Sequence, residues 1–413
     1  MMDELKKTDP AVYDLVQKEL DYERKTLRLI PSENYVSKAV LEATGSIFAN
    51  KYAEGYPRKR YYAGQKYVDE VEELAIERAK KLFGVDYVNV QPNSGSPANM
   101  AAYFAMLEHG DTMMGLELSQ GGHLTHGSPV NFSGKTYKVV SYKLDKTTER
   151  LDFDEIRKLA VESKPKVIVC GFTAYPYQVD FQKFREIADE VGAYLMADIS
   201  HIAGLIVGGV HPSPVSYADI ITSTTHKTLR GPRGAIIMTN SEELAKKVDK
   251  AIFPGIQGGP QIHSIAAKAV CFHEALQPSF KEYAHQIVKN AKALAEDLSK
   301  LGIRLVGGGT ETHLILFDTL SSKKITGKEA HEALEEAGII VNKNTIPYDT
   351  QKPFIGSGVR IGTPSVTTMG MKEPEMKKVA ELIVKVLDHP ADVSVKEHVR
   401  KEVEALCAKF PIY

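Results

Sequence analysis

Short apolar segments alternate with amphipathic segments over the first two thirds of the chain, and no other feature restricts the fold as much. The apolar runs that we expect to be strands are 85–90, 167–172, 193–197 and 218–222. The segments with helical periodicity are 69–83, 97–109 and 180–191. Gly84 and Gly192 follow two of these helices, where a helix C-terminus favours glycine. We therefore expect an α/β domain with a mostly parallel sheet, whose ligands bind beyond the carboxyl ends of its strands.

The pattern changes near residue 280, and this change predicts a second domain. A helical region over 260–301 ends at Gly302, and the segments that follow are shorter. The strands expected there are 304–306, 313–318 and 359–362, and the helices are 327–337 and 373–387. We expect residues 1–280 to form an N-terminal arm and a large ligand-binding domain, and residues 281–413 to form a smaller α+β domain.

The part of the chain before the alternation has a different character. Residues up to about Tyr22 predict a polar, amphipathic surface helix. The stretch 30–67 is crowded with Tyr, Gly, Pro and Arg, which predicts a long irregular loop. Its tyrosines argue against disorder, so we expect this loop to be functional.

Composition excludes several kinds of partner. Lys and Arg number 52 and Asp and Glu 53, so the net charge of −1 does not indicate nucleic acid or an anionic membrane. No apolar run approaches the ~18 residues of a membrane span, and the N-terminus lacks the features of a secretory signal. Cys170, Cys271 and Cys407 are too few and too scattered for a disulfide framework or a zinc site. We expect a cytoplasmic protein.

Lys227 stands where an apolar, β-branched segment ends, which is an unusual place for a cation. Burial of an ammonium costs several kcal/mol, on the order of the penalties for unpaired charge. Burial also favours the neutral, nucleophilic amine. Neutral lysines form Schiff bases, and pyridoxal phosphate is their common partner. The alternative is a lysine that extends into solvent at a strand end.

Asp198 ends the expected strand 193–197, and His201 follows three residues later. A carboxylate at this place would hold a pyridinium nitrogen protonated. His201 would then be near the oxygen of such a ring. A helix cap or buried ion pair for Asp198, and a hydrogen-bonded core histidine for His201, are the alternatives.

Ser94, Gly95 and Ser96 leave one expected strand and enter a helix, with Ser96 as the expected N-cap and Pro97 at the first helical position. Free backbone N–H groups and the helix dipole would bind phosphate there. The segment 257–260, before the next long helical region, is a second candidate of this kind. Simple helix capping is the alternative in both places.

The glycine-rich loop 121–127 carries His123 and His126. His123 would stack on the face of an aromatic cofactor. Two histidines at this spacing also suit a metal, but the local sequence offers no third ligand, so we expect no metal.

Arg360 lies inside an apolar strand of the second domain, where a guanidinium suits bidentate binding of a carboxylate. A structural ion pair is the alternative interpretation of Arg360, and the residue alone favours neither. Glu54 lies among several tyrosines, and apolar surroundings would raise its pKa and let it transfer protons. An aromatic interface loop with one surface acid is the alternative for this segment.

Ordered motifs over most of the chain resemble those of the serine hydroxymethyltransferases, pyridoxal-phosphate enzymes of the aspartate-aminotransferase fold (fold type I). The motifs are 29–34, 50–57, 121–127, 198–204, 225–234, 253–260 and 341–344. The resemblance runs from about Leu29 to Met371. It implies a large mostly parallel-sheet domain that binds the cofactor and a smaller α+β C-terminal domain.

The resemblance implies a role for each matching residue around pyridoxal 5'-phosphate. Lys227 would bind the cofactor covalently, Asp198 would pair with its ring nitrogen, and His123 would stack on the ring. His201 and Thr173 would lie near the phenolic oxygen. The residues implied in phosphate binding are Ser94, Gly95, Ser96 and His226, joined by Tyr52, Gly258 and Gly259 of a neighbouring subunit. The resemblance therefore implies at least a homodimer.

The resemblance also implies the substrates, L-serine or glycine and tetrahydrofolate or a modified pterin. Arg360 and Ser32 would bind the amino-acid carboxylate, Glu54 and Tyr62 would act near the serine hydroxyl, and Thr224 would orient these steps. The implied folate positions are Glu54, Tyr61, Leu118, Gly122, Leu124 and Asn344. The reaction would move the hydroxymethyl carbon of serine to folate reversibly. A folate-independent aldolase acting on threonine or allo-threonine is the alternative, and it would use the same Lys227.

Gln120, Tyr177 and Met369 differ from the pattern that the resemblance leads us to expect, and Thr173 occupies a place often held by serine. Gln120 stands where histidine is frequent, and Tyr177 stands where many relatives have arginine. Met369 replaces an expected arginine and removes a charge from the substrate-side domain. This change bears on local structure or activity level, and it leaves the reaction class intact.

Overall fold

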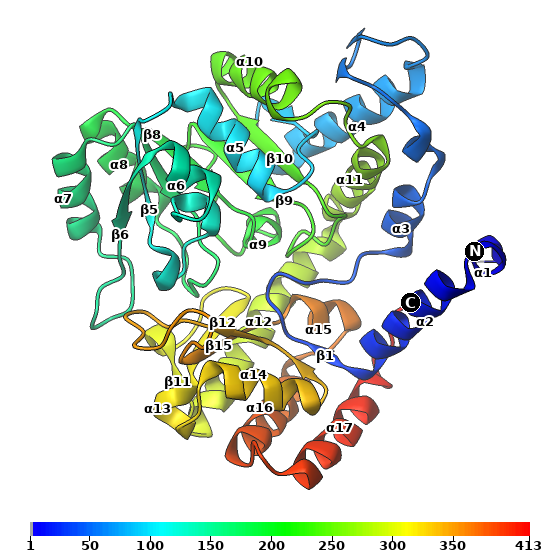
Figure 1. Cartoon of the computed structure of the whole chain (residues 1–413), viewed down its shortest axis with the longest axis vertical. Coiled ribbons are helices and arrows are strands. Elements are labelled where there is room, and N and C mark those ends of the chain that lie inside the picture. Colours follow the sequence, from blue (N-terminus) through cyan, green and yellow to red (C-terminus); the bar gives the residue numbers. More distant parts are fainter. Residues whose placement is uncertain (1–2) are drawn as a thin grey trace.

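The protein consists of two lobes, shown one above the other in Figure 1, in a computed structural model that describes residues 3–413. Met1 and Met2, which belong to the expected N-terminal arm, lie outside the described residues. The upper lobe contains a seven-stranded sheet and the lower lobe a four-stranded sheet. Within the described range, no helix is both long and apolar enough to cross a membrane.

The large sheet is mostly parallel, as the sequence predicts. Its strands are β4 (Tyr87–Asn89), β5 (Thr112–Leu116), β6 (Lys138–Tyr142), β7 (Val167–Cys170), β8 (Tyr194–Asp198), β9 (Ile220–Thr224) and β10 (Ala235–Thr239). They lie in the order β4-β10-β9-β8-β7-β5-β6. β10 is antiparallel to both of its neighbours, and the other pairs are parallel. The expected mixed α/β class is confirmed.

Helices cover both faces of this sheet. They are α4 (Lys66–Phe83), α5 (Gly95–Met106), α6 (Phe132–Thr136), α7 (Phe153–Ser163), α8 (Phe181–Val191), α9 (Ala203–Val207), α10 (Glu242–Lys250) and α11 (Ile262–Ala275). Val167 and Met196 pack on one face with α5 and α10, whereas their neighbours Ile168 and Leu195 pack on the other with α8 and α11. Successive residues of a strand point to opposite faces, so two-sided burial explains why these strands are apolar throughout.

The segment 30–67 is more regular than the sequence indicates. It contains the helix α3 (Lys38–Thr44), the 3₁₀ turn η1 (Ile47–Asn50) and a small hairpin of β2 (Gly55–Tyr56) and β3 (Lys59–Arg60). The hydroxyl of Ser37 caps α3 by accepting a hydrogen bond from the backbone N–H of Val40 at 3.1 Å. A serine cap is a helix-start signal that the many turn-forming residues around it obscure.

The small lobe is an antiparallel sheet with helices packed on it. Its strands are β11 (Arg304–Leu305), β12 (Leu314–Asp318), β14 (Asn342–Asn344) and β15 (Gly358–Gly362), in the order β11-β12-β15-β14. Its helices are α13 (Thr319–Lys323), α14 (Gly327–Glu336), α15 (Pro364–Met369), α16 (Glu373–Asp388) and α17 (Val393–Cys407). This is the α+β arrangement that the sequence predicts for the C-terminal part.

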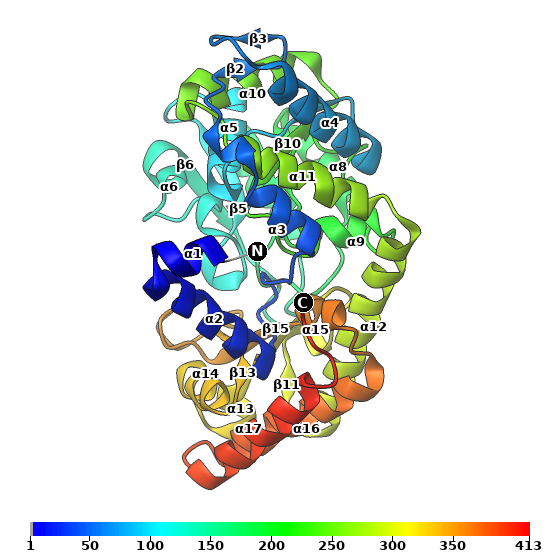
Figure 2. The same cartoon turned by 90° about the vertical axis from the view of Figure 1, so that its right-hand side faces the viewer.

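One long helix and one N-terminal segment join the lobes. Helix α12 (Pro278–Lys300) runs from one lobe to the other in Figure 2: Phe280 packs in the core of the large lobe and Leu294 in that of the small lobe. The expected boundary at residue 280 thus falls at the start of a helix that serves both cores.

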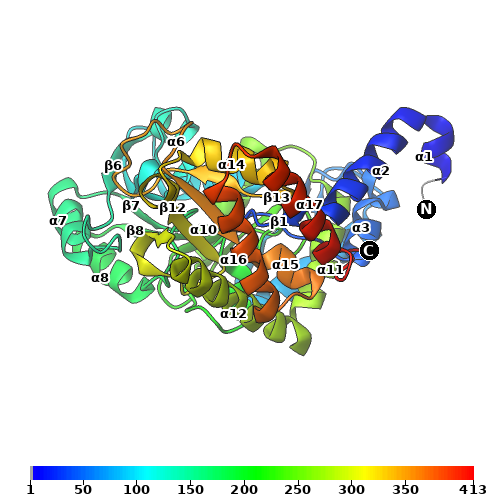
Figure 3. The same ribbon diagram turned by 90° about the horizontal axis from the view of Figure 1, so that it is seen from below.

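The N-terminal elements lie on the opposite side. Helices α1 (Asp3–Thr8) and α2 (Pro10–Lys25) extend from the body in Figure 3 and contain no buried residue. The following strand β1 (Leu27–Arg28) pairs in parallel with β13 (Ile339–Ile340) of the small lobe. Leu27 and Leu29 are buried in the small-lobe core, although the sequence places them in the first domain.

Candidate active site

A cavity of about 330 Å³ opens beyond the carboxyl ends of β8 and β9, where the small lobe meets the large one. Twelve residues proposed from the sequence line it: Ser32, Ser94, Gly95, Ser96, His123, Thr173, Asp198, His201, Thr224, His226, Lys227 and Arg360. Five further lining residues were not proposed: Asn99, His126, Phe172, Ser200 and Arg233. The motifs are far apart in the sequence. They meet because the carboxyl ends of parallel strands lie at the same edge of the sheet, which is also where ligands bind.

Lys227 is buried at the wall of this cavity, three residues after the end of β9. Only 9 % of the residue is exposed. Burial lowers the pKa of its amine from the ordinary 10.5 to about 8, an effect that Asp198 opposes and Arg360 reinforces. The neutral, nucleophilic amine is therefore readily available near neutral pH. Asn34 fixes the backbone here by donating its amide N–H to the carbonyl of Lys227 at 3.0 Å.

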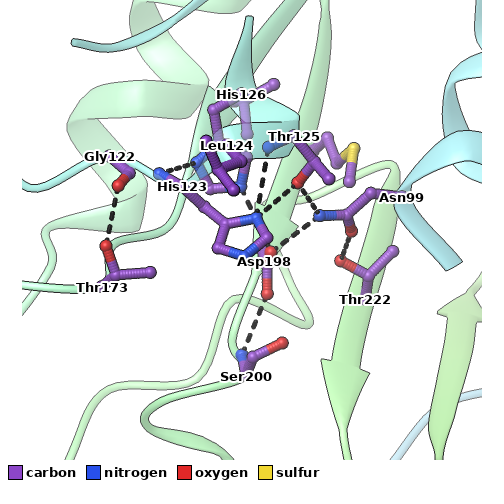
Figure 4. Close-up of polar contacts among 12 residues, drawn as sticks. Asn99, Gly122, His123, Leu124, Thr125, His126, Thr173, Asp198, Ser200 and Thr222 are labelled. Carbon is purple, nitrogen blue, oxygen red and sulfur yellow. Dashed lines mark hydrogen bonds and ion pairs between the residues drawn. The ribbon is translucent and has the colours of Figure 1, made fainter. Parts of the chain in front are cut away.

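The carboxylate of Asp198 is held by three groups, as Figure 4 shows. Its Oδ2 accepts a hydrogen bond from Asn99 Nδ2 at 2.9 Å and lies 3.2 Å from His126 Nε2. Its Oδ1 accepts from the backbone N–H of Ser200 at 3.1 Å. Asn99 is oriented in turn by the hydroxyl of Thr222, which donates to its Oδ1 at 2.7 Å. These contacts fix both the position and the orientation of the carboxylate.

These contacts also keep Asp198 ionised. Burial alone would raise the pKa of its carboxyl, but the hydrogen bond and charge of His126, with contributions from His123 and Asn99, hold it well below its usual range. An ionised carboxylate at the wall of a cavity can stabilise a proton on a ring nitrogen opposite to it.

His123 presents a neutral ring to the same cavity. Burial lowers the pKa of its imidazole to about 4, with the neighbouring His126 acting in the same direction. Its Nδ1 lies 2.7 Å from the hydroxyl of Thr125 and accepts a hydrogen bond from the Thr125 backbone N–H at 3.2 Å. A flat, uncharged ring held in this way suits stacking on an aromatic ligand.

Helix α5 points its N-terminus at the cavity, but it begins earlier than the sequence indicates. Gly95 is its first residue and Ser94 its N-cap, so the expectation of Ser96 as the cap and Pro97 at the first position was wrong. Ser94 is extended (φ −162°, ψ 176°), and its side chain makes no capping hydrogen bond. A Cβ on Gly95 would lie 2.8 Å from Thr224 Cγ2, so only glycine allows this close approach. The first N–H groups of the helix are therefore available to an anion.

The end of the cavity near this helix is suited to a phosphate. Arg233 also lines the cavity, and His226 carries an Nδ1 that is buried without a partner among the described residues. An unpaired buried nitrogen is costly and calls for a ligand. With the ionised Asp198 and the amine of Lys227 in the same cavity, the residues fit pyridoxal phosphate: a place for the phosphate, one for the ring nitrogen and one for the aldehyde carbon.

Arg360 reaches the cavity from the small lobe. It lies in β15, between Leu316 of β12 and Asn342 of β14. Its Nη1 donates to the carbonyl of Thr173 at 2.5 Å and its Nε to Asn342 Oδ1 at 3.1 Å. Burial lowers the pKa of the guanidinium to about 10, so it stays charged at neutral pH and can bind a carboxylate.

Thr173 connects two loops at the cavity wall. Its hydroxyl donates to the carbonyl of Gly122 at 2.7 Å and lies 3.1 Å from that of Gly121, as Figure 4 shows for Gly122. The hydroxyl proton is thus directed at the backbone, which leaves only the oxygen lone pairs for a ligand.

The remaining residues proposed for catalysis and phosphate binding form a separate group, which we call the tyrosine cluster. It consists of Tyr52, Glu54, Tyr61, Tyr62, Gly258 and Gly259. The hydroxyl of Tyr52 donates to Glu54 Oε1 at 2.9 Å, and the rings of Tyr52 and Tyr62 are 5.1 Å apart. A Cβ on Gly259 would lie 3.2 Å from the Tyr52 ring. Among residues 3–413, the lining of the Lys227 cavity includes no member of this cluster.

The other proposed folate residues lie outside the cavity lining as well. Leu118 and Leu124 are each more than 40 % exposed and follow β5. Asn344 ends β14, and the hydroxyl of the next residue, Thr345, donates to the carbonyl of Ser119 at 3.1 Å. This contact places the Asn344 strand against the Leu118 turn, although the two are far apart in the sequence.

The three unexpected residues have structural environments of their own. Gln120 is 4 % exposed. Tyr177 donates its hydroxyl to the carbonyl of Gly307 at 2.5 Å, and the guanidinium of Arg150 stacks 3.8 Å from its ring centre. Tyr177 therefore joins the two lobes. Met369 is buried in the small-lobe core, where an arginine would place a charge among apolar side chains.

Asn99 and His126 are the functional residues that the sequence analysis missed in the Asp198 network. Asn99 is a polar residue in an otherwise alanine-rich helix, and this is the one signal that points to it. Polar side chains on a buried helix face are normally hydrogen-bonded, so such a residue predicts a partner on the sheet. His126 was noted only as a possible metal ligand, and it contacts Asp198 instead.

Sheet, cavity and lysine together define a fold type I enzyme that depends on pyridoxal phosphate. A sequence model of the family described as serine hydroxymethyltransferase matches residues 5–383. The chain belongs to this family. Its members are pyridoxal-phosphate-dependent transferases of one-carbon metabolism, which act on serine and glycine and use tetrahydrofolate as co-substrate.

Proposed function

We propose that the protein transfers the hydroxymethyl carbon of L-serine to tetrahydrofolate reversibly, giving glycine and 5,10-methylenetetrahydrofolate. One observation carries the proposal: the amine of Lys227, the carboxylate of Asp198 and the guanidinium of Arg360 all line one cavity. A covalent anchor, a ring-nitrogen partner and a carboxylate-binding group are what an amino-acid reaction on pyridoxal phosphate requires.

The cavity residues would bind the cofactor in a single orientation. The N-terminus of α5, the hydroxyls of Ser94 and Ser96, and His226 would bind the phosphate. Asp198 would hold a proton on the ring nitrogen, and His123 would cover the ring face. When bound, pyridoxal phosphate withdraws electrons from the bonds at the amino-acid Cα. Lys227 would hold the cofactor and release it to the substrate amine.

Arg360 and Ser32 would fix the substrate by its carboxylate. A planar guanidinium binds a carboxylate through two parallel hydrogen bonds, which sets the direction of the amino acid as well as its affinity. This orientation decides which Cα bond is aligned for cleavage. The carbonyl of Thr173 holds Nη1 of Arg360 in place before substrate arrives.

The tyrosine cluster would complete the site of a second copy of the chain, which makes the protein at least a homodimer. Tyr52, Gly258 and Gly259 of one copy would reach the phosphate in the other. Glu54 would move a proton at the serine hydroxyl oxygen, and Tyr62 would lie beside it. Tyr61, Leu118, Leu124 and Asn344 would contact the pterin. The exposure of Tyr52, at 58 %, and of Tyr61, at 74 %, supports this assignment.

Serine cleavage measured with and without tetrahydrofolate tests the proposal. We expect tetrahydrofolate to accelerate cleavage strongly and to be converted to the methylene form in equal amount to glycine. Equal rates with and without folate would favour the aldolase alternative, which would also cleave allo-threonine faster than serine. The family match favours the folate enzyme, and so does the presence of residues at the implied folate positions Tyr61, Leu124 and Asn344.

A further inference from the structure

His313 is a buried histidine to which the proposed reaction gives no role. It directly precedes β12 of the small lobe and is 1 % exposed. Its imidazole stacks on that of His201, with ring centres 5.5 Å apart and 28° between the planes. His313 Nε2 lies 3.3 Å from His201 Nδ1. Through His313, the small lobe thus contacts a residue that lines the cavity.

Both imidazoles are neutral. Burial lowers the pKa of His313 to about 3, and burial with the positive charges of Lys227 and Arg360 lowers that of His201 well below its usual range. Two neutral imidazoles that share a hydrogen bond have one proton between their facing nitrogens. Two arrangements are therefore possible, and they give His201 opposite tautomers.

The far nitrogen of His313 distinguishes the two arrangements. His313 Nδ1 is buried and has no hydrogen-bond partner among the described residues. A hollow of about 10 Å³ that His313 lines is at the lower limit of what one water needs, and most of its lining is apolar or aromatic. Its one carboxylate, Asp198, already accepts hydrogen bonds from Asn99 Nδ2 and the backbone N–H of Ser200. Two tyrosine hydroxyls at its wall are engaged elsewhere: Tyr175 accepts from the N–H of Leu151, and Tyr177 donates to the carbonyl of Gly307.

A proton on His313 Nδ1 would therefore have no acceptor. Buried N–H groups without an acceptor are rare, and leaving one unpaired costs more than leaving a lone pair unused. The proton of His313 then lies on Nε2, which donates to His201 Nδ1. The two nitrogens of an imidazole point in nearly opposite directions. The proton of His201 accordingly lies on Nε2, the nitrogen that does not face His313. Because His201 lines the cavity, this N–H is the one available to a ligand there.

We propose that His313 is a positioning residue that fixes His201 as a neutral hydrogen-bond donor toward the cavity. The inference rests on the proposed function, because a donor is needed where a ring oxygen of the cofactor carries negative charge. An acceptor at the same place would repel that oxygen. His313 acts through His201. Because His313 belongs to the small lobe, a movement of that lobe would change the contact with His201.

Two-bond ¹H–¹⁵N spectra of the full-length protein, labelled at histidine, test the tautomer directly. The His201 signals are assigned by their loss in His201→Asn, with and without added pyridoxal phosphate. We expect Nδ1 of His201 to have the shift of an unprotonated nitrogen and Nε2 that of a protonated one. The reverse pattern in the wild-type protein would overturn the proposal.

Two substitutions separate hydrogen bonding from packing. His313→Gln keeps an N–H that can reach His201 Nδ1, and we expect it to keep the His201 pattern. His313→Leu removes the donor, so His201 should show a mixture of tautomers. We expect kcat for serine to fall about tenfold with KM nearly unchanged, less than the 10²–10⁴ of a group that transfers the proton itself. An unchanged His201 pattern in His313→Leu would contradict the inference.

His211 provides the matched control. It is also buried, but backbone groups engage both nitrogens: the N–H of Val179 donates to Nε2, and Nδ1 lies 2.8 Å from the carbonyl of Pro212. His211→Gln should leave the His201 pattern intact. If His313→Leu does not fold, the wild-type and His313→Gln spectra still decide the matter. Failure of the proposed function would appear as serine cleavage that ignores folate, and that result leaves the tautomer unaffected.

Discussion

The cavity around Lys227 and the tyrosine cluster carry residues of comparable chemical importance, but the chain holds them in opposite ways. In the cavity, Asp198 and Arg360 are partly buried, and each is fixed by hydrogen bonds with other elements. In the cluster, Tyr52 and Tyr62 are about half exposed, their rings contact each other, and Tyr52 is hydrogen-bonded to Glu54 of the same cluster. The difference shows that one region is an internal cavity whose side chains are already held in place, whereas the other is an exposed surface, as expected of residues proposed to serve a second copy.

The exposed cluster nevertheless has a rigid base. The side chain of Arg60 is buried, and its Nη1 donates to the carbonyls of Ala53 and Gly55, on either side of Glu54, at 3.0 and 2.8 Å. The same guanidinium pairs with Asp69 and Glu72 of α4 at 3.0 and 2.5 Å. The side chains of the cluster are therefore exposed on a fixed backbone, which would lower the entropy cost of the proposed docking into a second copy.

The largest effect is expected from Lys227→Ala, which removes the covalent anchor from the pocket. We expect the visible absorbance of the lysine-bound cofactor to vanish and serine cleavage to fall to background. The matched control is Lys268→Met. Lys268 is also buried, but its amine is bound by the carbonyls of Val90, Pro92 and Ala235, so it should cost about 3 kcal/mol of stability and leave the absorbance intact.

Subunit mixing tests whether the two regions belong to different copies in one site. Lys227→Ala and Glu54→Gln should each be nearly inactive alone. Half of the dimers in an equal, fully exchanged mixture are hybrids, and each hybrid has one site with both native residues. Activity should therefore return to about a quarter of wild type.

A second mixture provides the control for this experiment. Lys227 and Arg360 line the same cavity, so a mixture of Lys227→Ala and Arg360→Ala has no site with both native residues. It should recover no activity above that of its components. Recovery in this mixture, or none in the first, would mean that the cluster does not serve the cavity of a second copy.

Arg360→Ala should have a smaller effect that is confined to substrate binding and orientation. We expect kcat/KM for serine to fall about tenfold to hundredfold, mostly through KM, because a charge-assisted hydrogen bond to the carboxylate is lost. The cofactor absorbance should persist. Arg360→Lys should recover only part of the loss, since an ammonium cannot bind the carboxylate through two parallel hydrogen bonds. Unchanged kinetics in Arg360→Ala would place the carboxylate elsewhere.

The smallest expected effect is the pH dependence of cofactor attachment. The neutral amine of Lys227 attacks, and its pKa is about 8, so the attachment rate to cofactor-free protein should rise with pH and level off above that value. Between pH 7 and 9 we expect about a tenfold increase. A rate that still climbs steeply beyond pH 9 would indicate a lysine with its ordinary pKa, and stopped-flow absorbance would show it.

The sequence predicts most of the large sheet because its central strands are buried on both faces and are therefore continuously apolar. It fails to indicate β5, which contains Gly115, and the edge strand β6, which is partly exposed. Gly115 is needed because a Cβ there would lie 2.8 Å from the carbonyl oxygen of His126. Close backbone approach of this kind depends on tertiary contacts and leaves no periodic signal.

In the candidate site, too, some residues can be predicted from the sequence, whereas others depend on tertiary contacts. Lys227, Asp198 and Arg360 stand out in the sequence because a charge at or inside an apolar strand is unusual. His313 also precedes an apolar strand, but its significance comes only from the ring of His201 stacked against it. The tyrosine cluster can be recognised from its motif. The pattern of a single chain does not indicate whether the cluster serves the cavity of its own chain or that of a second copy.

The pairing of β1 with β13 has a consequence for how the chain is made. Leu27 can join Ile339 only after the intervening three quarters of the chain have left the ribosome. At about 5–20 residues per second this takes roughly 15–60 s, during which Leu27 and Leu29 have no core to enter. The large lobe could form earlier during synthesis. The N-terminal segment that contains Leu27 and Leu29 would remain accessible to chaperones and proteases until synthesis is nearly complete.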